Sequence, residues 1–411
     1  MSNHQHHRAV FVSNNANTHL LTQQILNAKA QAPFDAFNNK KGLLFSSIVL
    51  KELIEEEARH EYSDVTKYTN RVLKTLSSGE QKKTLLQHLM AQQPEFIILD
   101  NPFDNLDVAS QAALRSMLTE AASHITFIQL VQRKADLLPF ITNSVYLSEH
   151  NTIVDESEEQ DVSVINDTAV TLPPPIHPYT IDNNELIRFN NVTVQYHDRT
   201  IINNICWTIN AGEFWQLVGP NGSGKTTMLT MITGDNPKAY GQDITLFGKR
   251  KGSGETVWEI KEKIGYITMA MTDLFSTRHT LQQMIISGFV DSIGLYIKPS
   301  DLQIKLANEW LQLLHMQHLA NTPFCNLSIG QQRKALIARA MVKHPPLLIL
   351  DEPLSGLDDS NATMVIALIN QIAKASNTAI IYVSHRVEEQ LSPQFVFQLT
   401  ATSDGSVGKV V

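Results

Sequence analysis

The sequence predicts an α/β fold built twice along one chain, each copy a mainly parallel sheet with helices around it. Three observations lead to this prediction. Apolar segments of strand length alternate with helical segments, one glycine-rich turn joins such a strand to a helix, and a pattern in the first half returns in the second. With 411 residues, 43% of them hydrophobic, the chain is long enough to form two sizeable cores.

The glycine-rich turn lies in the second half, between the apolar segments 214–218 and 228–232. It fits G-x-x-x-x-G-K-[ST], and a strand before it and a helix after it are the context that a P-loop requires. In such a loop, backbone N–H groups and a helix N-terminus converge on phosphates, a lysine reaches the terminal phosphates and a hydroxyl ligates Mg²⁺. The residues expected to hold nucleotide are Gly219, Asn221, Gly222, Ser223, Gly224, Lys225, Thr226 and Thr227, with Thr226 also on the metal.

Four later segments decide the family. They are Leu327–Gln332, Leu347–Pro353, Leu357-Asp358 and Val383–His385, and their order and spacing resemble the signature, Walker B strand, D-loop and switch histidine of the ATP-binding cassette (ABC) ATPases. Two carboxylates end the apolar Walker B strand: Asp351 is expected to hold Mg²⁺ through water, and Glu352 to act as the general base.

The same resemblance implies two further contacts with ATP. His385 would face the γ-phosphate, and Tyr196 would stack on the adenine. For each residue a plainer interpretation stays open, because an ordinary polar histidine and a half-buried strand tyrosine are both common.

The first half repeats this pattern, but several of its motif residues are substituted or missing. Its own signature, Leu76–Gln81, precedes the second signature by 251 residues (327 − 76), and Asp107 precedes Asp358 by the same number (358 − 107). Asn101 stands where Glu352 stands and cannot take a proton from water, and Gln132 stands where His385 stands. Residues 12–21 look like a P-loop remnant that has lost its Gly-Lys pair, so no phosphate cradle is expected there.

The first copy is also shorter. If Thr18 matches Thr226, the offset at the P-loop is 208 (226 − 18), so about 43 residues (251 − 208) are missing between P-loop and signature. The chain also begins almost at the P-loop strand, so we expect the missing parts to correspond to the antiparallel strands on the adenine side and to part of the helical region.

Paired cassettes of this family clamp each ATP between the P-loop of one and the signature of the other. The second P-loop would therefore face Ser77, Gly79 and Gln81 of the first signature, which is well formed. The other site would join the P-loop remnant to a signature in which Ile329 replaces a small residue. The sequence thus predicts one hydrolytic site in a pseudo-heterodimer. The alternative is that the first signature is a relic and Ile329 a neutral variation.

Composition suggests the domain boundaries. We expect a degenerate cassette over 1–148, an acidic and proline-rich linker over 149–184 that stays extended, and a complete cassette over 185–411. A net charge of −8 and a pI of about 6.0 argue against a nucleic-acid surface. No apolar run is long enough for a membrane span, which favours a cytoplasmic chain, either a monomer with paired cassettes or a homodimer.

Two segments depart from the general pattern. Met269 stands where the Q-loop glutamine is usual, which weakens the case for ordinary transporter coupling, although Thr268 or Asp273 can be considered as substitutes. The segment Ser287–Tyr296 resembles the helical-region insert of soluble tandem cassettes of the ModF and PhrA type, whose names imply molybdate transport and photorepair.

Two other classes stay open. A translation factor of the ABC-F type also has two cassettes, but its linker is basic and helical. A conventional motor docked on a separate membrane permease is the second alternative, against which Met269 and the shortened first helical region both count.

Overall fold

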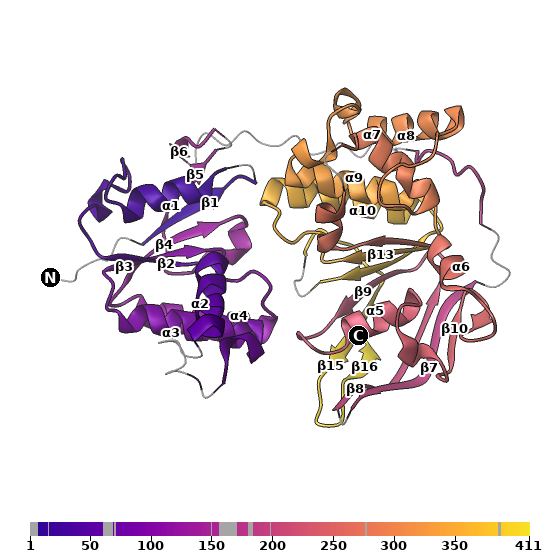
Figure 1. Cartoon of the computed structure of the whole chain (residues 1–411), viewed down its shortest axis with the longest axis horizontal. Helices are drawn as coiled ribbons and strands as arrows, with labels where there is room; N and C mark the ends of the chain where they lie inside the picture. Colours follow the sequence, from indigo (N-terminus) through magenta and orange to yellow (C-terminus); the bar gives the residue numbers. More distant parts are fainter. Residues whose placement is uncertain are drawn as a thin grey trace. The chain divides into compact units, whose positions relative to one another are not determined.

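The computed structural model describes residues 7–14, 16–60, 69, 71–148, 150–155, 171–179, 184–197, 199–275, 278–384 and 388–411. The chain forms two compact units (Figure 1). The first comprises Met1–Val162 with Gly356–Ser360, and the second comprises Ser163–Ser355 with Asn361–Val411.

The first unit is built on one six-stranded sheet in the order β2-β3-β4-β1-β5-β6. All neighbouring strands are parallel except the pair β5 and β6. Its strands are β1 (Arg8–Val12), β2 (Gly42–Phe45), β3 (Phe96–Asp100), β4 (Thr126–Val131), β5 (Asn143–Leu147) and β6 (Ile153–Asp155). Its α-helices are α1 (Thr18–Leu26), α2 (Ser47–His60), α3 (Ser78–Ala91) and α4 (Val108–Ala121).

Alternation along the strands gives this sheet a core on each face. Ala9, Ile97 and Phe127 pack into one cluster with α3 and α4, whereas the next residues, Val10, Ile98 and Ile128, pack into the other cluster with α1. Figure 1 shows the same division, with α1 on one face of the sheet and α2, α3 and α4 on the other. Strands β1 and β3 of this unit therefore read as nearly continuous apolar runs, whereas β4 also buries the polar Gln129.

The second unit contains a sheet of the same design, in the order β12-β13-β14-β9-β15-β16, again parallel except for its last pair. Its strands are β9 (Phe214–Val218), β12 (Ile264–Ile267), β13 (Leu347–Asp351), β14 (Ala379–Val383), β15 (Phe395–Thr400) and β16 (Val407–Val410). A four-stranded antiparallel sheet, order β11-β10-β7-β8, is added to it, from β7 (Glu185–Tyr196), β8 (Arg199–Asn210), β10 (Ile244–Leu246) and β11 (Lys249–Arg250).

The helices of the second unit cover both faces of the parallel sheet. One cluster of buried side chains joins the antiparallel sheet, α5 and the parallel sheet into one core. The helices are α5 (Lys225–Ile232), α6 (Val257–Glu262), α7 (Leu281–Ile286), α8 (Asp301–Leu313), α9 (Ile329–Met341) and α10 (Asp359–Ala375).

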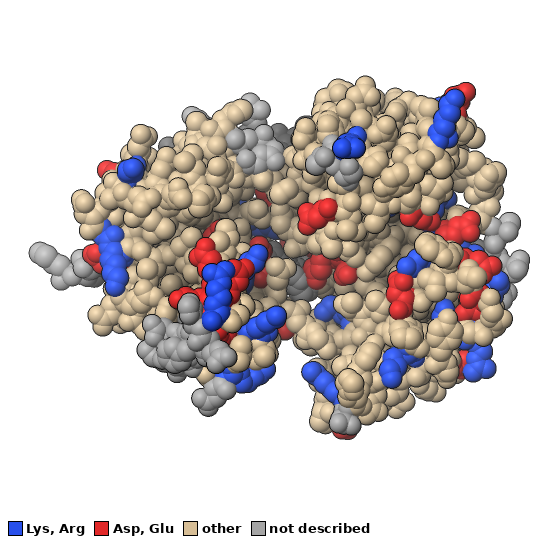
Figure 2. Space-filling view, in the orientation of Figure 1, with Lys and Arg blue, Asp and Glu red and all other residues tan. Residues whose placement is uncertain are grey.

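The two parallel sheets match strand for strand, which confirms the predicted fold class and its repeat. Among its described residues the first unit has no counterpart of the antiparallel sheet. No helix in the described part of the chain has the length and apolar character needed to span a membrane. Figure 2 shows lysine and arginine interspersed with aspartate and glutamate on the face in view, rather than gathered into a basic surface.

Two described parts of the predicted extended linker, 150–155 and 171–179, contact the folded units. Ile153–Asp155 forms strand β6, because its two apolar residues extend the first sheet. Residues 171–179 lie against the second unit: Leu172 is buried, the Nε2 atom of His344 lies 2.6 Å from the Pro173 carbonyl oxygen, and the Tyr179 hydroxyl donates to the Glu262 carbonyl. Proline-rich composition thus leaves the backbone extended and still lets single apolar side chains pack.

Candidate ATP-binding site

The glycine-rich turn of the second unit has the backbone geometry of a phosphate cradle. It runs from the end of β9 to the start of α5, with φ of +76° at Gly222 and +95° at Gly224, the left-handed region that glycine tolerates best. A Cβ atom at Gly224 would lie 2.5 Å from Cγ2 of Ile202 in β8, so the antiparallel sheet packs directly against the turn. Glycine is therefore required here on two counts, conformation and space.

Polar groups converge inside this turn. The Lys225 ammonium donates to the carbonyl oxygens of Gly219 (2.7 Å) and Pro220 (3.1 Å), which holds it over the loop. The Ser223 hydroxyl is buried and has no hydrogen-bond partner among the described residues. Gly224 is the N-cap of α5 and provides no side-chain cap, so the amides of the first helical turn can bind an anion. These features fit the phosphates of a nucleotide.

Two carboxylates lie at the end of β13, which is separated from β9 by β14. Asp351 is the last residue of β13, and Glu352 follows with φ of +54°, its N–H donating to the Val383 carbonyl of β14 at 3.0 Å. Burial, assisted by the adjacent Glu352, raises the pKa of Asp351 to about 6, while Lys225 partly opposes the rise. A cation at this carboxylate would relieve the repulsion, so the pair fits Mg²⁺ together with the hydroxyl of Thr226, the second residue of α5.

The remaining predicted contacts are placed in part. His385 lies outside the described residues, although the strand that precedes it, β14, is described. Tyr196 ends β7, is 39% exposed, and exchanges hydrogen bonds with the Asn236 amide, while Lys238 lies 5.9 Å from its ring centroid. An exposed ring held by its hydroxyl is available for stacking, and its role toward adenine stays a prediction.

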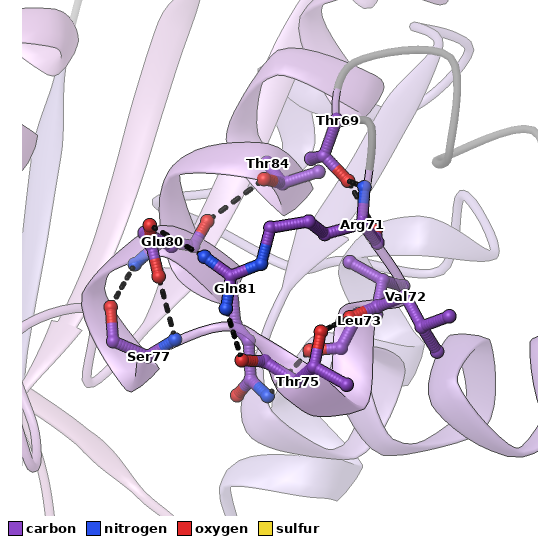
Figure 3. Close-up of polar contacts among 9 residues, drawn as sticks. All are labelled: Thr69, Arg71, Val72, Leu73, Thr75, Ser77, Glu80, Gln81 and Thr84. Carbon is purple, nitrogen blue, oxygen red and sulfur yellow. Dashed lines mark hydrogen bonds and ion pairs between the residues drawn. The ribbon is translucent and has the colours of Figure 1, made fainter. Parts of the chain in front are cut away.

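The first signature begins helix α3 in the first unit. Ser77 is the N-cap: its hydroxyl accepts from the Glu80 N–H, and the Glu80 carboxylate accepts from the Ser77 N–H at 2.8 Å (Figure 3). Arg71 reaches the same carboxylate, and the Gln81 amide donates to the Leu73 carbonyl at 2.9 Å. Gln81 therefore has a structural contact within its own unit, and its predicted contact with nucleotide is untested.

The second signature has the same frame. Ser328 caps α9 in the same way, and Gln332 donates to the Phe324 carbonyl at 3.1 Å. Each signature glycine faces the helix that follows its Walker B strand: a Cβ at Gly79 would lie 2.3 Å from Oγ of Ser110, and one at Gly330 would lie 1.8 Å from Oδ1 of Asn361. The frames are thus equivalent, and the two signatures differ in side chain at two positions, Glu80 against Gln331 and Ser78 against Ile329, the last of which is 37% exposed.

The first unit keeps the Walker B backbone without its chemistry. Asn101 has φ of +44° and donates to the Leu130 carbonyl at 3.2 Å, the arrangement that Glu352 has with Val383. Asparagine tolerates this conformation more readily than glutamate does, so Glu352 holds strain that Asn101 does not. Backbone strain is thus present at Glu352 and absent at its amide counterpart, Asn101. This difference agrees with a functional role for Glu352.

Helix α1 of the first unit begins in a different way from α5. Its N-cap is Asn17, whose side-chain oxygen accepts from the Leu20 N–H at 3.0 Å, and whose own N–H donates to Asn151 at 2.6 Å. The helix end that binds phosphate in a P-loop is here closed by a side chain of the helix itself. The loss of the phosphate cradle from the first unit stays a prediction.

Sequence reasoning did not single out one pair of residues. Lys82 and Arg333 occupy the same helix position 251 residues apart (333 − 82), and both are buried. A cation repeated at one position on the inward face of two related helices is the signal that identifies them. Arg333 contacts Met269, the residue at the Q-loop position, with 2.8 Å between Nη2 and Sδ.

The distinctive segment after α7 packs on α9. A Cβ at Gly288 would lie 2.1 Å from the Arg339 carbonyl oxygen, so the two backbones are in direct contact. Arg339 donates to the Ser287 hydroxyl and the Ser292 carbonyl, and the buried Lys343 ammonium forms an ion pair at 2.5 Å with Asp291, whose side chain is exposed. These contacts make the insert part of the helical region that carries the second signature.

Comparison with known proteins agrees with this geometry. A family model described as ABC transporter matches residues 202–355. The ABC transporter ATP-binding protein ModF of Escherichia coli (strain K12) is 41% identical over 341 residues, which cover 79% of this chain and 69% of that protein. An uncharacterized ABC transporter ATP-binding protein of Schizosaccharomyces pombe is 31% identical over 322 residues, 76% of this chain and 66% of that protein. The chain thus spans about two thirds of the length of these two relatives.

One solved structure matches nearly the whole chain. The archaeal ribosome recycling factor aABCE1, crystallised with the ribosomal stalk protein aP1, has a TM-score of 0.62 at 15% identity, covering 98% of this chain and 84% of that one. At that identity the match concerns the fold alone, and it extends the likeness to both halves.

Proposed function

Because the chain belongs to the family of ABC transporter ATP-binding proteins, we propose that it binds and hydrolyses Mg-ATP at one composite site and uses the cycle for conformational work. The observation that supports one site over two is the contrast between the helix starts: α5 opens on glycine and keeps its amides for phosphate, whereas α1 is closed by Asn17.

Each predicted site residue of the second unit has a defined role in this proposal. The turn amides and Lys225 hold the phosphates, Thr226 and Asp351 hold Mg²⁺, and Glu352 accepts the proton of the attacking water. Held by Thr226 and Asp351, Mg²⁺ would supply positive charge next to the phosphate oxygens. His385 orients the γ-phosphate, and Tyr196 stacks on the adenine.

The first unit contributes the second wall of the site. We assign to Ser77 and Gly79 the contact with the γ-phosphate held by Lys225, with Gln81 fixing the turn that presents them. Support comes from the way the changes sort: the absent cradle and Ile329 belong to one composite site, whereas the P-loop, the Walker B carboxylates and the first signature, which are intact, belong to the other, in which Met269 at the Q-loop position is the departure. Decay without selection has no reason to sort them so.

The work driven by ATP concerns a partner. The relatives are named as transporter ATP-binding proteins, so an integral-membrane permease is the partner class we propose, although Met269 and the shortened first helical region count against a conventional docking mode. Co-purification from native cells tests this: an integral-membrane protein supports it, whereas ribosomal RNA in the eluate would favour a ribosome-associated factor.

A pair of equivalent substitutions tests the composite site. Ser77→Arg places bulk and positive charge where a small hydroxyl must donate to the γ-phosphate, so it should abolish steady-state phosphate release. The matched control, Ser328→Arg, faces the site without a cradle and should be far milder. Both serines are N-caps with the same capping box, so the two changes weaken folding to a similar degree.

Three outcomes are distinguishable when unfolding temperatures are matched. Selective loss in Ser77→Arg supports the intramolecular pair. Equal loss in both, or a greater loss in Ser328→Arg, indicates that the working site forms between the second cassettes of two separate chains. Full activity in both contradicts any signature contact.

A further inference from the structure

Arg333 is a buried cation without a matching anion. It lies on α9, is 2% exposed, and its Nε and Nη1 atoms have no hydrogen-bond partner among the described residues. Among the described residues its polar contact is with the Met269 sulfur, a weak acceptor. Burial lowers the pKa of this guanidinium to about 10. Burying a charge without acceptors costs free energy. A conformation in which the Arg333 guanidinium finds hydrogen-bond acceptors would therefore be favoured.

The repeat shows where a cation at this position finds acceptors. Lys82, the counterpart of Arg333 on α3, is also buried, and its ammonium donates to the carbonyl oxygens of Pro102 (3.0 Å) and Asp104 (2.8 Å), with that of Asn101 at 3.5 Å. These three carbonyls belong to the turn that follows β3. In the first unit the cation thus joins the signature helix to the end of the Walker B strand.

The corresponding turn of the second unit has the same backbone. Glu352 and Asn101 share positive φ and the same bond to the next strand. Ser355 N–H donates to the Glu352 carbonyl at 3.2 Å, as Asp104 N–H does to the Asn101 carbonyl at 3.3 Å. The carbonyls of Glu352, Pro353 and Ser355 are therefore arranged as the lysine acceptors are in the first unit, while Arg333 points to Met269 instead.

We propose that Arg333 is a positioning residue whose guanidinium has two alternative sets of contacts. In the state described here it contacts Met269, and on Mg-ATP binding it donates to the carbonyls of the turn at Glu352–Ser355. There it braces the strained backbone of the general base, as Lys82 braces Asn101. The Q-loop position, which has no glutamine in this chain, is then connected to the catalytic turn through one side chain. This inference rests on the proposed hydrolysis of ATP at Glu352.

Two substitutions in the full-length chain separate the roles. Arg333→Lys supplies the side chain that Lys82 uses, so it should raise the unfolding midpoint without nucleotide and keep kcat close to wild type. Arg333→Met removes the charge and the donors. Its unfolding midpoint without nucleotide should also rise, but the further rise on adding Mg-ATP should shrink, and kcat should fall on the order of tenfold or more, as expected when a catalytic group is misplaced.

The matched control is Lys82→Met, in the first unit. It removes a donor from paired carbonyls, so the unfolding midpoint without nucleotide should fall, opposite in sign to Arg333→Met. A purely structural role for Arg333 predicts that the lysine and methionine variants hydrolyse ATP alike.

The proposal is overturned if Arg333→Met keeps the wild-type kcat, if Arg333→Lys is as slow as Arg333→Met, or if Arg333→Met lowers the midpoint without nucleotide. Absence of ATP hydrolysis in the wild-type chain would instead refute the proposed function, and the positioning role with it. The midpoints without nucleotide would still report whether the buried charge is uncompensated.

Discussion

The titration of Asp351 links catalysis to stability at the scale of one residue. Its pKa in the folded chain, about 6, lies above its ordinary value of 3.8, so the folded state holds this proton more tightly than the unfolded state does. Stability from this group is therefore present below the ordinary pKa and is lost as pH rises through about 4 to 6. At neutral pH the nucleotide-free chain bears two repelling carboxylates that only a cation makes favourable.

Replacing Asp351 by Asn should reveal this cost. Without nucleotide, the unfolding midpoint of Asp351→Asn should exceed that of wild type at about pH 7.5, and the difference should shrink toward about pH 4.5, where the wild-type carboxyl is protonated. Thermal unfolding across this range measures it. Added Mg-ATP should stabilise wild type more than the variant, because the metal ligand is gone.

Asp100 provides the matched control, because burial raises its pKa as well. Asp100→Asn should show the same direction of pH dependence without changing the stabilisation by Mg-ATP. A stability difference for Asp351→Asn that grows on acidification would refute the assignment of its raised pKa.

Two helices that begin at equivalent places diverge in what their first turn can bind. The amides of α5 follow a glycine and serve an anion, whereas those of α1 are served by Asn17. An N-cap side chain and a bound phosphate satisfy the same orphan donors, so a helix start uses one or the other.

Variants of Asn17 test this difference between the helices. Asn17→Ala should lower the free energy of unfolding by about 1 kcal/mol, the usual effect of losing an N-cap. Asn17→Asp should keep the cap, since an acidic side chain suits a helix N-terminus. Both should hydrolyse ATP at the wild-type rate per folded chain. A large loss of ATP binding in Asn17→Asp, where negative charge would repel phosphate, would place a nucleotide at α1.

Element by element, the sequence was most informative where a spacing or a period carries the signal. The strands ending at Val218, Asp351 and Val383 follow from apolar runs before polar motifs, and the order of the first sheet follows from the repeat. Strand β6 was missed because three residues give no periodicity. Arg333 was missed because a charged residue within a helical pattern reads as a solvated face, and only packing shows that it is buried.

At the scale of the whole chain, both units share the cassette fold, but the P-loop that is predicted to hold nucleotide occurs in the second unit. This difference predicts how many nucleotides one chain binds. The first unit keeps the sheet, the signature frame and the Walker B turn, so its parts fold as a cassette does. It lacks the lysine, the open helix start and, among its described residues, the antiparallel sheet that packs on the P-loop. Each loss concerns the binding of nucleotide rather than the stability of the unit.

We therefore expect one tight Mg-ATP site per chain. Glu352→Gln provides the trap, because loss of the general base should slow hydrolysis by roughly two to four orders of magnitude while the phosphate contacts persist. Equilibrium dialysis of this variant should give one bound Mg-ATP per chain, and adding Lys225→Ala should reduce binding to none, since the cradle loses its cation. If a second tight site persists after Lys225→Ala, then the first unit binds nucleotide through contacts other than a P-loop, and the closed start of α1 does not decide the stoichiometry.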